Sequence, residues 1–170
     1  FQDVRTFGDM AGNTQTYGAL SATESWGAWK PSAKTRITVG RQRIAFDNER
    51  IVGAVNWSQY GRFLDGFRWD QTTVLGTTTV ALTWDAPAGL TRIMGSHLYT
   101  SDWQRLSFLY FDQKKSLDPT ASVVTAGASW TGKAKNEAVS WVVEAYAQEQ
   151  RNGQPTSFMG VAELHGAFGN

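Results

Sequence analysis

Apolar and polar residues alternate along most of this chain, with a period of two that is typical of β-strands whose two faces differ. Over residues 77–84, Val80, Leu82 and Trp84 fall on one face, while mostly threonine falls on the other. The same alternation recurs in three further segments: 35–39, 124–130 and 139–147. The spacing therefore predicts strands that each carry one apolar and one polar face.

Weaker alternation predicts additional strands, and clusters of turn-forming residues separate them. The additional segments are 1–8, 20–29, 63–71, 90–98, 103–111 and 158–168. The separating turns are 30–32, 85–89, 114–119, 132–136 and 151–155. The pattern gives roughly nine or ten strands of about ten residues each and no helix. We therefore expect an all-β, antiparallel up-and-down arrangement that forms a single domain over residues 1–170.

Composition narrows the chemistry that the chain can carry. The 170 residues include 8 Trp, 5 Tyr, 9 Phe and 17 Gly but no Cys, and the net charge is +1. The lack of Cys excludes disulfides, cysteine-based zinc sites and cysteine nucleophiles. The near-neutral charge argues against a wholly basic nucleic-acid binder. His97 and His165 are too few for a histidine-built metal site, and no H-E-x-x-H, Walker A or G-x-S-x-G motif occurs. We expect neither an enzyme nor a bound cofactor or metal.

The face of the sheet that lies inside decides between two classes of protein. In a soluble β-sandwich the apolar face is the core, whereas in a membrane β-barrel the apolar face meets lipid and the polar face lines the lumen. Polar faces rich in Gly, Ser and Thr, long strands and aromatic residues near strand ends favour the barrel. Those aromatic residues are Trp26, Trp29, Trp69, Trp84, Trp103 and Trp130. We expect a transmembrane β-barrel, or a segment of a larger one.

Basic residues are concentrated in the middle of the chain. Between residues 34 and 68 they are Lys34, Arg36, Arg41, Arg43, Arg50, Arg62 and Arg68, and the acidic residues are Asp47, Glu49 and Asp65. Seven positive and three negative charges leave a local balance of +4, against +1 for the whole chain. Either these residues form structural ion pairs on a wet face, such as Arg68 with Asp70 or Arg50 with Asp47, or the arginines line a channel that attracts an anionic substrate.

Four stretches of this region carry a recognisable pattern. They are Gly40-Arg41-Gln42, residues 46–53 (FDNERIVG), Asn56-Trp57 and residues 61–68 (GRFLDGFR). This pattern resembles the alginate-export family of outer-membrane β-barrels, and residues 2–9 look like the strand that precedes it in that family. The match is specific over residues 37–68, supportive over 1–36 and only compositional after residue 76.

The resemblance implies a closed barrel in the outer membrane of a Gram-negative bacterium, which passes an alginate-like polyuronate through an Arg-rich lumen. By position, it implies that the lumen is lined by Arg41, Arg43, Arg50, Arg62 and Arg68, with Asp47 and Asp65 orienting them. The Arg-rich region adds Lys34 and Arg36 to the expected lining and Asp70 to the expected ion pairs. Because barrels of this family are larger than these strands could form, we expect the chain to be a segment of a longer barrel.

Strand parity conflicts with part of this lining. Arg41 and Arg43 share the alternation of Ile37 and Val39, which we expect to face lipid. A bulge near Gly40 that redirects the two arginines, or the end of the strand there, would resolve the conflict.

The expected partners are an anionic polysaccharide and the lipid bilayer, with periplasmic export proteins as further candidates and no nucleic acid. Two other functions stay open at this point. The same barrel could serve as a general or nutrient-uptake porin. Alternatively, the chain could form a soluble β-sandwich that binds carbohydrate on an aromatic platform.

Overall fold

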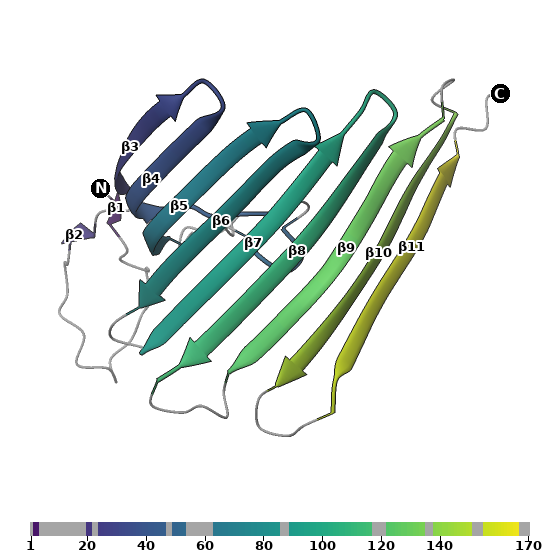
Figure 1. Ribbon diagram of the computed structural model, residues 1–170. Coiled ribbons are helices and arrows are strands. Elements are labelled where there is room, and N and C mark those ends of the chain that lie inside the picture. The colour runs from purple at the N-terminus through teal and green to yellow at the C-terminus, as the bar shows by residue number, and fades with distance from the viewer. Residues whose placement is uncertain are drawn as a thin grey trace.

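The computed structural model describes residues 2–3, 20–21, 24–46, 49–53, 63–85, 89–116, 122–134, 138–150 and 155–166. Nine strands form one antiparallel sheet, in which each strand pairs with its neighbours in the sequence (Figure 1). They are β3 (Ser25–Ser32), β4 (Thr35–Gln42), β5 (Leu64–Thr73), β6 (Gly76–Asp85), β7 (Leu90–Thr100), β8 (Gln104–Lys115), β9 (Val123–Lys133), β10 (Val139–Gln150) and β11 (Ser157–Gly166). Two short strands, β1 (Gln2–Asp3) and β2 (Leu20–Ser21), pair separately. The described part of the chain contains no helix long and apolar enough to cross a membrane.

The predicted all-β, antiparallel up-and-down sheet is confirmed, whereas its closure into a barrel is not observed. Strand order runs from β11 to β3 without a crossover, and these two strands form the edges of the sheet among the described residues. The strands of the sheet contain 8 to 12 residues, close to the expected length. The observed architecture is therefore an open sheet of nine strands connected in sequence.

Connections at the two ends of the strands differ in length. At one end, β3–β4 and β5–β6 turn through two residues each, 33–34 and 74–75. At the other end, residues 43–63 join β4 to β5 and residues 116–122 join β8 to β9. The connection between β4 and β5 is long enough to fold back over the sheet.

The sheet buries its mainly polar face and exposes its apolar face, which is the reverse of a soluble β-sandwich. On β6, Ala81 and Thr83 are 0% exposed, whereas Leu82 and Trp84 are 42% and 48% exposed. We name these sides the polar face and the apolar face. Other exposed side chains of the apolar face are Val39, Phe67, Val80, Ile93, Phe108, Tyr110, Trp130 and Val143. Other buried side chains of the polar face are Thr38, Gln42, Thr79, Ser107, Thr125, Ser129 and Glu144. The covered face is therefore mainly polar, and the uncovered face is apolar.

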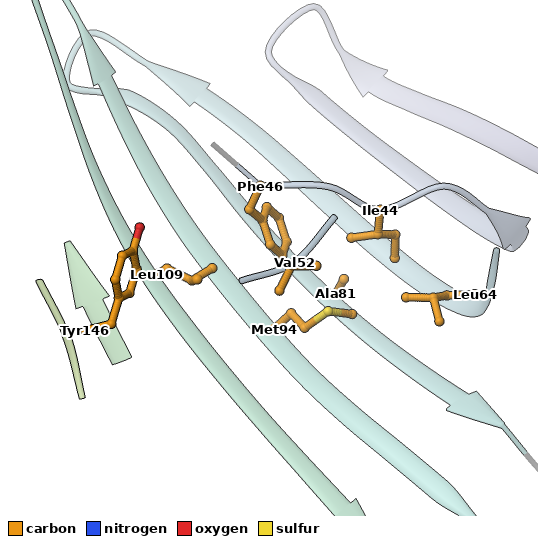
Figure 2. Packing of buried hydrophobic residues seen from close by; sticks show 8 residues of the cluster. All are labelled: Ile44, Phe46, Val52, Leu64, Ala81, Met94, Leu109 and Tyr146. Atoms are coloured by element: carbon orange, nitrogen blue, oxygen red, sulfur yellow. The ribbon is translucent and has the colours of Figure 1, made fainter. Parts of the chain in front are cut away.

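A segment between β4 and β5 covers the polar face. We call residues 43–46 and 49–53 the covering segment. Its apolar side chains pack on a small apolar patch of the sheet, as Figure 2 shows. The cluster consists of Ile44, Phe46 and Val52 from the segment, and Leu64, Ala81, Met94, Leu109 and Tyr146 from the sheet. Removal of these side chains from water, at about 25 cal/mol per Å² of apolar surface, holds the segment in place.

The covering segment is a compact turn rather than an extended strand. The backbone N–H of Phe46 donates to the carbonyl oxygen of Val52 at 3.0 Å, and the N–H of Glu49 donates to that of Phe46 at 3.0 Å. Glu49 has a φ of 61°, a left-handed conformation that residues other than glycine rarely adopt. The turn brings Phe46 and Val52 together, so that both side chains reach the sheet.

A glycine on β9 makes room for a large side chain of this cluster. Gly127 is paired in register with Tyr146 on β10. A Cβ atom at position 127 would collide with the Tyr146 ring and with the carbonyl oxygen of Ala145. The missing side chain thus lets the ring lie flat against the neighbouring strand.

Gly127→Ala is expected to lower the free energy of unfolding by about 1–3 kcal/mol, because the added methyl group must displace the ring or the strand. Gly95→Ala is the matched control, since a Cβ built there meets no atom within 4 Å. The control should change stability by no more than about 0.5 kcal/mol. Chemical denaturation followed by tryptophan fluorescence measures both variants, and equal stabilities would contradict the close packing of Tyr146 on Gly127.

Candidate functional site

Strand parity divides the central arginines between the two faces of the sheet. Arg36 on β4 and Arg68 on β5 lie on the polar face, where Thr38 stands directly opposite Arg68. In the same register, Arg36 stands opposite Asp70. The fold thus brings two of the predicted lining residues together with a predicted acidic partner.

Arg68 and Asp70 form a multiply bonded ion pair. The Nη2 and Nε atoms of Arg68 donate to the Asp70 carboxylate at 2.8 and 2.9 Å. Thr79 on β6 also donates, from Oγ1 to Oδ1 of Asp70 at 2.7 Å. Charge-assisted bonds in a bidentate arrangement are stronger than neutral ones and fix the geometry of both partners. The Asp70 carboxylate therefore already accepts hydrogen bonds from both Arg68 and Thr79.

Arg36 and Arg43 line a cavity of about 210 Å³ together with Trp26 of β3 and with Glu24, the residue just before β3. Arg43 pairs with Glu24, with Nε 2.8 Å from Oε1. The guanidinium carbon of Arg43 lies 5.0 Å from the centre of the Phe63 ring, and that of Arg36 lies 5.2 Å from the Trp26 ring. Both distances are within the range of cation–π attraction. We call this the Trp26 cavity; its lining is Glu24, Trp26, Arg36, Thr38, Gln42, Arg43, Arg68 and Asp70. Three arginines against two carboxylates leave it positively charged.

Arg50 ties the covering segment to a distant strand. Its Nε atom lies 2.6 Å from Oε2 of Glu144 on β10, and the Glu144 side chain is fully buried. Six strand intervals separate β4 from β10. That separation is about 29 Å along the sheet at roughly 4.8 Å per interval. The segment therefore spans much of the polar face, and Arg50 is held by Glu144. The expected partner Asp47 lies outside the described residues.

Two more cavities lie beside the covering segment, and each has an arginine in its wall. A cavity of about 320 Å³ is lined by Arg50 together with Tyr146 and Gln148. A cavity of about 180 Å³ is lined by Arg92, whose Nε donates to Oε1 of Gln113 at 2.9 Å. Arginines thus occur along the polar face well beyond the Arg-rich part of the sequence.

Arg41 lies on the opposite side from this group. The pairing of β4 with β5 runs unbroken through Gly40 and places Arg41 opposite Asp65. No bulge redirects Arg41, so it shares the apolar face with Val39. Its Nε and Nη2 atoms donate to Asp65 at 2.8 and 2.7 Å. Arg43, by contrast, follows the end of β4 and reaches the Trp26 cavity.

The remaining predicted residues are not part of this arrangement. Lys34 is exposed in the tight turn between β3 and β4. Arg62 and Asp47 lie outside the residues that the structure describes. The polar-face group therefore contains Arg36, Arg43, Arg50 and Arg68 from the predicted lining.

Sequence reasoning missed several members of the site. Glu24 and Trp26 precede the Arg-rich region and reach it only because β3 pairs with β4. The alternation along β10 places Glu144 on the same polar face as Tyr146 and Gln148. It does not indicate which residue Glu144 contacts. The described residues hold no group of three His, Cys, Asp or Glu side chains that could bind a metal ion.

Comparison with protein-family models, curated proteins and solved structures finds no match for this chain. The resemblance to the alginate-export family therefore stays an expectation from the sequence.

A double-mutant cycle tests whether Arg50 and Glu144 hold the covering segment. Arg50→Met and Glu144→Gln should show a coupling free energy of about 1–3 kcal/mol, because the carboxylate is buried and the two side chains are in contact. The matched cycle uses Arg41→Met and Asp65→Asn, whose side chains are 40% and 39% exposed; its coupling should not exceed about 1 kcal/mol. Unfolding free energies supply both values. A coupling for Arg50 and Glu144 no larger than that of the control pair would contradict the anchoring role.

Proposed function

We propose that this chain forms part of the wall of an outer-membrane channel that passes an anionic polysaccharide. The observation that carries the proposal is the inverted burial of the sheet. Apolar side chains such as Leu82 and Trp84 are exposed along one face, while the mainly polar face is covered. Exposed apolar patches of more than a few hundred Å² are rare on soluble monomers and mark contact with a membrane or a partner. Lipid contact on the apolar face accounts for this distribution along the inner strands of the sheet.

The position of the covering segment argues against a soluble β-sandwich. In a sandwich, a second layer packs on the apolar face and forms the core with it. Here the packed layer is the covering segment, and it lies on the other side of the sheet, against Ala81 and Met94. The aromatic-platform module considered from the sequence would leave the apolar face in water.

The charges of the polar face favour an anionic solute. Arg36, Arg43 and Arg68 surround the Trp26 cavity, and Arg50 reaches from the covering segment to Glu144 on the sheet. A positive field inside a low-dielectric wall concentrates anions. Because the covering segment occupies space over this face, it narrows the path beside the arginines. Several weak contacts in series let a polymer enter and still leave, as transport requires.

The proposal also requires strands beside β3 and β11. Unpaired backbone N–H and C=O groups in lipid cost several kcal/mol each, so neither edge can face the hydrocarbon core. Further strands that close the sheet would give the larger barrel that the resemblance implies, with an alginate-like polyuronate as its substrate.

Lipid contact is testable with single cysteines, because the chain has no Cys of its own. Spin labels at Leu82→Cys and Ser96→Cys would report on neighbouring strands and opposite faces. In membranes, the label at 82 should collide mainly with oxygen, which concentrates in lipid, and the label at 96 mainly with a water-soluble nickel complex. A protein that stays soluble without detergent, with the label at 82 open to the nickel complex, would overturn the channel.

Ion selectivity tests the role of the arginines. In planar bilayers, the Arg43→Gln/Arg68→Gln variant should lose anion preference roughly two- to five-fold, because two fixed positive charges leave the wall. Arg41→Gln is the matched control, since Arg41 pairs with Asp65 on the apolar face. Full anion preference in the double variant would contradict the proposal that Arg43 and Arg68 line the channel. Block of conductance by polyuronate and neutral sugar alike would indicate a general porin instead.

A further inference from the structure

The three arginines of the Trp26 cavity are not equivalent. Arg43 pairs with Glu24, and Arg68 pairs with Asp70. Arg36 forms no ion pair with any described residue, and its Nε atom is buried without a hydrogen-bond acceptor there. The excess positive charge of the cavity therefore belongs to Arg36.

The register explains why Arg36 has no carboxylate partner among the residues that the structure describes. Asp70 is directly opposite Arg36 across the β4–β5 pair and would be its natural partner. However, the Asp70 carboxylate already accepts bonds from Arg68 and from Thr79. Arg36 lies instead over the Trp26 ring, with its guanidinium carbon 5.2 Å from the ring centre. The cation is thus held in position, and no carboxylate in the described part of the chain forms an ion pair with it.

The surroundings of Arg36 suit one sugar ring that carries a carboxylate. The cavity of about 210 Å³ is smaller than the usual pocket for a drug-sized ligand. Trp26 is 46% exposed and offers apolar ring surface to the C–H groups of a pyranose. Thr38 and Gln42 add polar groups to the same wall, which could bind sugar hydroxyls. A planar guanidinium recognises a carboxylate through two parallel hydrogen bonds.

We propose that the Trp26 cavity is a discrete binding site for a single uronate unit, with Arg36 as the residue that binds its carboxylate. This inference rests on the proposed function for its choice of a sugar acid, but it concerns one defined site rather than the path as a whole. The sugar ring would lie beside Trp26, next to the edge strand β3.

Isothermal titration with sodium glucuronate tests the site directly. The wild-type protein should bind glucuronate, and Arg36→Met should weaken the affinity about tenfold or more, because a charge-assisted pair is lost. Arg41→Met removes an arginine of the same strand from the apolar face, so it should bind like wild type. Arg36→Lys keeps the charge but lacks the planar fork and should bind with intermediate affinity. It also provides a readout if Arg36→Met fails to fold.

Two further titrations separate a uronate site from simpler alternatives. Glucose has the ring without the carboxylate, and sulfate has the charge without the ring. Both should bind at least tenfold more weakly than glucuronate. Sulfate binding as tight as glucuronate would reduce the cavity to a bare anion site, and equal glucose binding would remove the role of Arg36; either result overturns the inference.

The two proposals can fail separately. Glucuronate binding that depends on Arg36, in a protein without channel conductance, would support the uronate site and overturn the channel. An anion-selective channel whose affinity for glucuronate is the same in wild type and Arg36→Met would support the channel and overturn the site.

Discussion

The contact between the covering segment and the polar face is the interaction on which the rest of this structure depends. A sheet with alternating faces can be covered on either side, and here Phe46 and Val52 pack beside Ala81 and Met94. That contact selects the polar side as the enclosed one. Arginines that share its parity then become neighbours in a confined space, and the buried carboxylate of Glu144 meets Arg50. The uncovered side is the apolar one, and this is the observation on which the proposed contact with a membrane depends.

Much of this arrangement could be predicted from local sequence patterns. The parity of Leu82 and Trp84 assigns the faces of β6 correctly, and the same holds for β4, β9 and β10. Neighbour pairing follows because short connections join antiparallel strands. Partners that are distant in sequence could not be predicted in this way. The covering segment has no periodicity that shows which face it covers, so Glu144 could not be chosen as the partner of Arg50.

The candidate site shows how parity can separate residues that composition treats alike. Arg36 and Arg41 belong to the same strand, but their positions differ by an odd number, so they lie on opposite faces. A local charge balance counts both, whereas the field in the Trp26 cavity depends on the polar face alone. The residue at which β4 ends is equally important for the site. Arg43 follows that residue, so the alternation of the strand does not decide on which face its side chain lies. Prediction of the site thus needed the strand boundary and the absence of a bulge, which the sequence left open.

The inverted burial has a consequence for how such a protein could change over evolutionary time. Side chains on the apolar face, such as Leu82, are held in no packed core, so Val, Leu, Ile and Phe could replace one another there with little effect on their neighbours. On the polar face, Gly127 must accommodate a ring and Glu144 must meet an arginine. The outer side would therefore preserve its hydrophobic character while its residue identities drift, and the inner side would preserve individual residues. In a water-soluble sheet the opposite distribution holds, because variation is concentrated on the polar exterior and the apolar core is retained.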